Sequence, residues 1–179
     1  MHRYKTYNAA MPTTAAMAGV ATANGVKTLL QLSTPSTRQI QLISWGYSVS
    51  VTPPGISTIE LIQTDVAATV TAHVAAGVQP LDPNAPASLL TLGTANTGYT
   101  ATAEGTTTAS RVFSSVLLGA AAGNENLCYE YQWMPDERPI IAISKFLRVR
   151  TTFTSTSPLI GNRRSRWTMV SSVIRRPGV

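Results

Sequence analysis

The sequence predicts an all-β protein whose fold is an antiparallel β-sandwich of the jelly-roll type. From Lys27 onward, apolar and polar residues alternate with the period of two that strands require. Segments rich in Pro, Gly, Asn and Ser separate the alternating segments and are typical of turns. About eight or nine short strands joined by polar turns indicate two packed sheets, and a jelly roll fits this count.

Residues 1–26 are expected to form an extended N-terminal arm, which precedes a single β-sandwich domain at residues 27–179. They show no apolar period of either helix or strand, and Ala, Thr, Met and Gly dominate them. Such a terminus is usually disordered unless something ties it down, so we expect a neighbouring subunit to hold the arm.

The first strands of the domain are predicted from three alternating segments. Residues 27–33 form the first, and residues 38–51 form the second, in which a one-residue slip beside Gly46 predicts a β-bulge. The slip moves the apolar side chains from one face to the other: Ile40 and Leu42, then Ile43, Trp45, Tyr47, Val49 and Val51. After a turn at residues 53–55, Ile59 and Leu61 continue on the third strand.

The middle of the chain is predicted to contain one strand and one long loop. In residues 69–78, the alternation places the apolar side chains inward and Thr69, Thr71 and His73 outward. A helix is the competing interpretation, because Ala is frequent in this segment. Residues 79–105 are rich in Pro, Asn, Gly and Ala and are expected to form a loop excursion, of the kind that often carries contacts or function.

Further strands are expected in the last part of the chain, at residues 107–118, 127–134, 145–154 and 166–175. The cleanest alternation is in the second of them, where Tyr, Tyr and Trp alternate with Cys, Glu and Gln. The third is expected to point its apolar side chains inward and two basic side chains, Arg148 and Arg150, outward.

Charge is sorted along the chain. Residues 1–137 carry five basic and eight acidic side chains, whereas residues 138–179 carry nine basic side chains and no acidic one, which together give the net charge of +6. Only 12% of the residues are charged, and a surface so poor in charge suits burial in an assembly. The asymmetry indicates a large anionic partner rather than a small substrate.

Residues that carry chemistry are few. The only histidines are His2 and His73, Cys128 is the only cysteine, and no spacing typical of a zinc or calcium site occurs. The two glycines at 93 and 98 have the spacing of a phosphate-binding loop, but Tyr99 stands where such a loop needs Lys. The sequence therefore predicts neither an enzyme nor a bound cofactor or metal. A membrane is not an expected partner either, because the apolar runs are far shorter than the roughly 20 residues of a membrane helix.

The basic side chains are the candidate contact residues. They fall in the arm, in a loop before the last strand and in the C-terminal tail: Arg3, Lys5, Arg163, Arg164, Arg166, Arg175 and Arg176. Few aromatic residues are interleaved with them, in contrast to proteins that bind single-stranded nucleic acid. The preferred partner is therefore an acidic protein surface, and nucleic acid is not the expected partner.

Several segments resemble small jelly-roll proteins of tailed bacteriophages. The resemblance covers roughly residues 27–155 and is carried by Ile-Ser-Trp-Gly-Tyr (43–47), Ile-Glu-Leu-Ile-Gln-Thr-Asp (59–65), the loop from Gly77 to Ser88, Gly98-Tyr-Thr-Ala-Thr-Ala-Glu-Gly105, Tyr131-Gln-Trp133 and Phe146-Leu-Arg-Val-Arg150. It implies a decoration or cement protein on the exterior of the virion capsid, often a trimer, whose terminal arms clamp the shell. The implied partners are the major capsid protein and further copies of the chain, and the resemblance supplies no catalytic residues.

Two other functions stay open from the sequence. A jelly-roll coat protein that forms the shell itself would use the arginines on packaged nucleic acid. A carbohydrate- or receptor-binding β-sandwich would use the 79–105 loop and an exposed Tyr99.

Overall fold

The computed structural model describes residues 2–11, 14, 20–22, 24–49, 53, 55–106, 108–119, 127–153 and 169–173, with Leu127 and residues 169–173 described by their backbone alone. The elements, in chain order, are β1 (His2–Thr6), β2 (Gly25–Ser33), β3 (Ile40–Val49), β4 (Ser57–Thr64), β5 (Thr69–Ala72), the short 3-10 helix η1 (Ala75–Gly77), β6 (Gln79–Pro80), β7 (Gly98–Ala103), β8 (Ala109–Leu118), β9 (Leu127–Gln132), β10 (Ile140–Ile141), β11 (Phe146–Phe153) and β12 (Met169–Val173). No helix in these ranges is long and apolar enough to cross a membrane.

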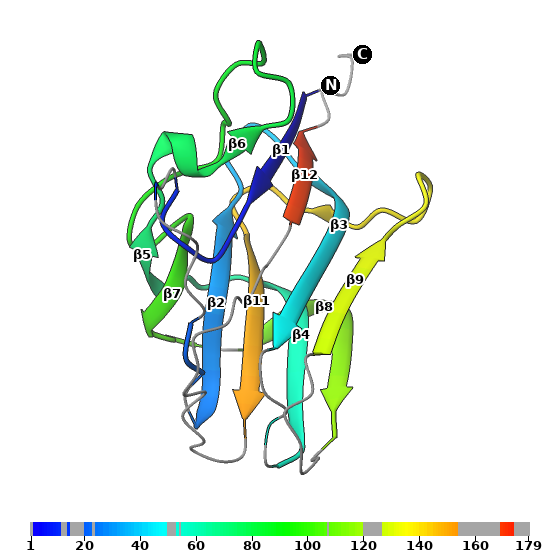
Figure 1. Ribbon diagram of the computed structural model, residues 1–179. Coiled ribbons are helices and arrows are strands. Elements are labelled where there is room, and N and C mark those ends of the chain that lie inside the picture. The colour runs from blue at the N-terminus through cyan, green and yellow to red at the C-terminus, as the bar shows by residue number, and fades with distance from the viewer. Residues whose placement is uncertain are drawn as a thin grey trace.

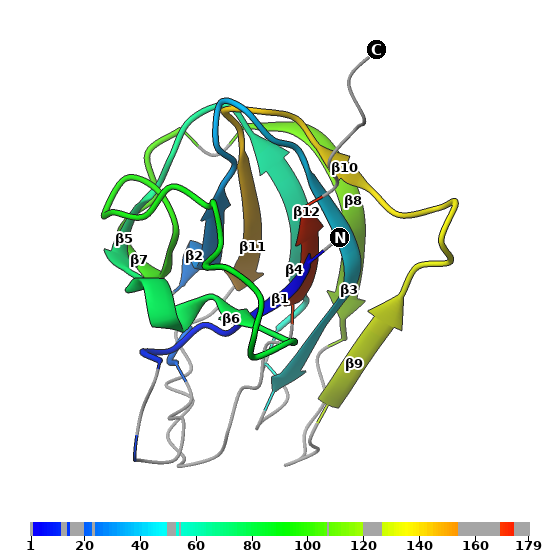
Figure 2. The same ribbon diagram turned by 90° about the horizontal axis from the view of Figure 1, so that it is seen from above.

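The strands form two antiparallel sheets of six strands that lie face to face (Figures 1 and 2). Sheet A has the order β10-β3-β12-β1-β6, and β9 also pairs with β3. Sheet B has the order β5-β7-β2-β11-β4-β8. The predicted all-β antiparallel sandwich is therefore confirmed.

The strands pair in a nested order. β1 pairs with β12, β2 with β11, β3 with β9 and β4 with β8, and successive pairs alternate between the two sheets. Strands from the first part of the chain thus lie beside strands from its later part, and these antiparallel pairs pass from one sheet to the other (Figure 1).

Apolar side chains from both sheets fill the space between them, and Leu30, Leu32, Ile59 and Leu61 are fully buried there. β3 contains a bulge, but at Ile43 rather than beside Gly46: Leu42 and Ser44 pair with the consecutive residues Ser171 and Val170 of β12, whereas β3 pairs with β9 across Gly46 without a register shift. The expected change of face does not follow from it. Because the bulge absorbs Ile43 as an extra residue, the apolar residues on both sides of it belong to the same core: Ile40, Leu42, Trp45, Tyr47 and Val49.

The structure differs from the expected arm at residues 2–6. These residues form β1, an interior strand of sheet A that pairs with β12 on one side and β6 on the other. Tyr4 is only 4% exposed and packs in the core, and Thr6 is buried as well. The strand is held by its own chain because its neighbours in the sheet complete the hydrogen bonds that an arm would leave open.

The middle of the chain also differs from expectation. Strand β5 ends at Ala72, and η1 takes the place of the second half of the strand predicted at 69–78. His73, expected to point outward, is 3% exposed, whereas Val74, expected to point inward, is 59% exposed. The predicted 79–105 loop contains β7, which pairs with β2 and β5 inside sheet B.

Candidate binding surface

The basic residues of the C-terminal part were expected to face outward, and the structure places Arg148 differently. Arg148 is fully buried although it points away from the apolar core between the sheets, as its neighbours Leu147 and Val149 fill that core. Its Nε donates to Gln31 Oε1 at 3.0 Å, one terminal nitrogen donates to Val66 O at 2.7 Å, and the other donates to Glu104 O at 3.3 Å.

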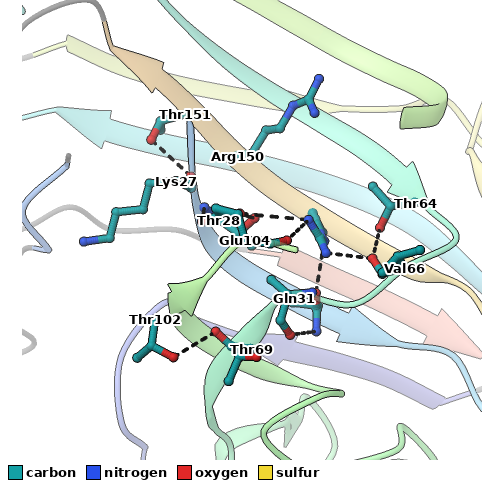
Figure 3. Close-up of polar contacts among 12 residues, drawn as sticks. Lys27, Thr28, Gln31, Thr64, Val66, Thr69, Thr102, Glu104, Arg150 and Thr151 are labelled. Atoms are coloured by element: carbon teal, nitrogen blue, oxygen red, sulfur yellow. Dashed lines mark hydrogen bonds and ion pairs between the residues drawn. The ribbon is translucent and has the colours of Figure 1, made fainter. Parts of the chain in front are cut away.

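Segments outside sheet B cover this guanidinium (Figure 3). Gln31 on β2 exchanges hydrogen bonds with Ala68, through Ala68 N to Oε1 at 2.8 Å and through Nε2 to Ala68 O at 3.2 Å. The Glu104 carboxylate lies 3.9 Å from the guanidinium and accepts from the backbone N and the hydroxyl of Thr28. Burial lowers the pKa of Arg148, an effect that the Glu104 carboxylate opposes. Arg148 therefore anchors the cover of sheet B and is not available to a partner.

Two further basic residues pair with acidic residues from the first part of the chain. Arg150 on β11 lies opposite Glu60 on β4, and its Nε is 2.7 Å from Glu60 Oε2. Lys145 Nζ is 2.8 Å from Asp65 Oδ1, and the hydrogen bond from Lys145 lowers the pKa of Asp65. Of the four basic residues that the structure describes after residue 137, three thus face an acidic residue from the first part of the chain.

Arg3 and Lys5 keep their charges available. They alternate along β1 with the buried Tyr4 and Thr6, so they lie on the outer face of sheet A. Arg3 is exposed, and Lys5 is half-buried with its Nζ 5.2 Å from the centre of the Tyr7 ring. Neither forms an ion pair with an acidic residue of the part of the chain that the structure describes. We call these two residues the basic face of β1.

The other candidate contact residues are Arg163, Arg164, Arg166, Arg175 and Arg176, and all five lie outside the described residues. The structure therefore brings together Arg3 and Lys5 alone, on one strand. Sequence reasoning found these two through their charge, although it placed them in an arm rather than in a sheet.

A second surface, which the sequence analysis did not predict, runs along β8, β9 and β10 at one side of the sandwich (Figure 1). Arg111 of β8 bridges the two sheets there by donating to Ile140 O at 3.0 Å. Large apolar side chains are exposed along this side, which we call the apolar side: Val112, Leu117, Tyr131, Met134 and Ile140. Two bulges interrupt the pairing of β8 with β4, whereas β9 pairs with β3 without a register shift. Where exposed apolar side chains form one contiguous patch, they mark a surface that another protein covers.

The residues considered for chemistry do not assemble into a reactive group. Cys128 is exposed on β9, whereas His73 follows β5 on the other side of the sandwich (Figure 1). Tyr99, expected to be exposed for a carbohydrate, is half-buried and packs against the His73 ring at 4.9 Å. No cluster of three or more metal-ligating side chains occurs among the described residues. Comparisons with protein-family models, curated proteins and solved structures give no match to this chain.

Proposed function

We propose that the chain is a structural virion protein: a capsid decoration or cement protein that binds the exterior of a bacteriophage head and stabilises it. The observation that carries this proposal is the basic face of β1. Arg3 and Lys5 are available on the outer face of sheet A, while Lys145, Arg148 and Arg150 are paired within the chain. The partner is an acidic surface of the major capsid protein.

The position of the basic face in the middle of a sheet supports docking of a protein surface. Because β1 is flanked by β12 and β6, its backbone is held in the sheet, so Arg3 and Lys5 keep a fixed spacing along the strand and the backbone loses little conformational freedom when a partner binds. A stable interface covers about 800 Å² on each partner, so the neighbouring surface of sheet A must contribute as well.

The apolar side supports association between copies of the chain, and a trimer is the expected state. In sheet A, β12 and β3 separate β1 from β9 and β10, and β8 lies in sheet B, so self-association and shell binding can use different surfaces (Figure 1). Several copies that bind one shell raise the effective concentration of each weak contact. The jelly-roll plan, common in viral capsid proteins, supports this assignment by analogy of fold only.

Charge reversal on β1 tests the proposal. Deletion of residues 1–26 would remove a strand of sheet A, so it would confuse binding with folding. We expect Arg3→Glu with Lys5→Glu to weaken binding to shells that lack the protein by about tenfold at low salt. Arg38→Glu is the control for charge reversal away from β1, because Arg38 is half-buried like Lys5 and its side chain donates to Thr37 O in its own turn. Equal binding by both variants, or no binding by the wild-type chain, would overturn the proposal.

A further inference from the structure

His73 is a buried histidine that joins three separate parts of the fold. It follows β5 and precedes η1, and its ring packs against Tyr99 of β7. Its Nε2 lies 3.0 Å from the backbone oxygen of Tyr7 and 3.3 Å from Thr6 Oγ1, where β1 ends. The imidazole therefore fastens the end of β1 to the segment that follows β5.

The hydrogen bonds assign the tautomer of this ring. A backbone carbonyl can only accept, so Nε2 carries the proton that is donated to Tyr7 O. Thr6 Oγ1 donates to Gly77 O at 3.2 Å, which leaves its oxygen free to share the proton of Nε2. In the neutral ring, Nδ1 is then without a proton, and it is buried without a hydrogen-bond partner among the described residues.

Protonation would place a second N–H on Nδ1, for which no described residue supplies an acceptor within hydrogen-bond distance. The ring packs closely against Gly77, since a Cβ built on this glycine would lie 2.6 Å from Nδ1. The titratable groups on the packed elements are the phenols of Tyr7 and Tyr99, and Lys5 lies over the Tyr7 ring. No carboxylate is among the described contacts of His73, and burial lowers the pKa of its imidazole while the Tyr7 bond opposes this.

We propose that His73 is an acid-sensitive latch, which holds the end of β1 in its neutral form and releases it when the ring is protonated. Because the folded state disfavours the proton, the unfolded chain binds more protons below the ordinary histidine pKa of about 6.5. The stability that the neutral ring contributes is present above this pH and is lost as the pH falls toward the lower value in the fold. The released element carries the basic face of β1, so acid would alter the surface that Arg3 and Lys5 occupy.

Hydrogen–deuterium exchange of the full chain between pH 7.5 and 5, corrected for the intrinsic exchange rate, tests the latch. We expect the opening of residues 2–11 to increase by up to about tenfold per pH unit once the ring titrates, while β11 at the centre of sheet B stays protected. His73→Gln keeps an amide donor for Tyr7 O and cannot titrate in this range, so its exchange should be insensitive to pH. His2→Gln is the matched control, because His2 is exposed, and it should behave like the wild type.

A second measurement decides the question if His73→Gln does not fold. Nitrogen and ring-proton chemical shifts of the two histidines report their tautomers and titrations in the wild-type chain. We expect His73 to keep the proton on Nε2 and to titrate below the ordinary histidine pKa of about 6.5. Titration of His73 at or above this value, or equal acid opening in His73→Gln and wild type, would overturn the proposal.

Discussion

Arg148 donates from Nε to Gln31 Oε1 at 3.0 Å, so a fully buried guanidinium on β11 is tied to the neighbouring strand β2 on the outer side of sheet B. Through Gln31 the same contact reaches the backbone of Ala68. The segments that cover the outer side of sheet B, at residues 66–68 and 104, are thus held by the Arg148 cation and not by apolar packing alone.

Replacement of Arg148 should destabilise the fold. We expect Arg148→Ala to lower the free energy of unfolding by about 3 kcal/mol, because it leaves a cavity and removes the charge that faces Glu104. After this replacement, Gln31 Oε1, Val66 O and the Glu104 carboxylate each still accept a hydrogen bond from another donor, which limits the loss of stability. Arg148→Met should cost less, because it preserves volume, and urea unfolding measures both. Arg150→Ala is expected to cost about 1 kcal/mol or less, because the ion pair of Arg150 is partly exposed. If Arg148→Ala cost less than Arg150→Ala, the anchoring role of Arg148 would be contradicted.

Gly46 should tolerate no side chain. A Cβ at this position would lie 2.7 Å from Tyr129 O, so Gly46→Ala must push β9 away from β3. We expect a loss of about 1–3 kcal/mol in thermal or urea unfolding. Gly119→Ala is the matched control, because nothing lies within 4 Å of its Cβ. If the two variants were equally stable, β9 would not pack on β3 as described.

Tyr47 should make the protein sensitive to alkali. Burial, with the neighbouring Tyr129 and Cys128 acting in the same direction, raises the pKa of Tyr47 to about 12. Since the unfolded phenol ionises near pH 10, stability should fall as the pH rises above about 10. Tyr47→Phe should remove part of this fall in urea midpoints measured from pH 8 to 11. Tyr131→Phe, at a partly exposed position, should leave it unchanged, and the opposite ranking would contradict the assignment.

The apolar side should control self-association. Leu117 and Met134 are 66% and 68% exposed, so an aspartate at either position should convert an associated species to monomer in sedimentation velocity. Leu89→Asp is the matched control, since Leu89 is similarly exposed in the segment between β6 and β7. A wild-type chain that is monomeric at all concentrations, or dissociation caused by Leu89→Asp alone, would exclude this surface as the contact.

Alternation predicted the strands well where both their length and their amphipathic character were pronounced. The segments predicted at 27–33 and 127–134 correspond to β2 and β9. Strand β1 was missed because five residues give too short a period, and its partner β12 lies at the other end of the chain.

The environment of single side chains was harder to predict than the strands. Arg148 does point away from the core between the sheets, but a pattern of alternation cannot show that residues 66–68 and 104 cover it. His73 is buried by hydrogen bonds from β1, which no local pattern records. Arg3 and Lys5 could be predicted as contact residues from their charge. In contrast, the sequence of β8 does not show whether another part of the chain covers this strand.

The pairing of β1 with β12 also sets the order in which the molecule can be made. Strand β1 finds its five-residue partner β12 only when residues 169–173 have been synthesised. Loop-closure entropy opposes a contact between such distant segments, so the β1–β12 pair should form late and slowly, after pairs of shorter separation such as β5 with β7. A chain that stops before Met169 would leave β1 and β3 with open edges, and edges of that kind invite aggregation.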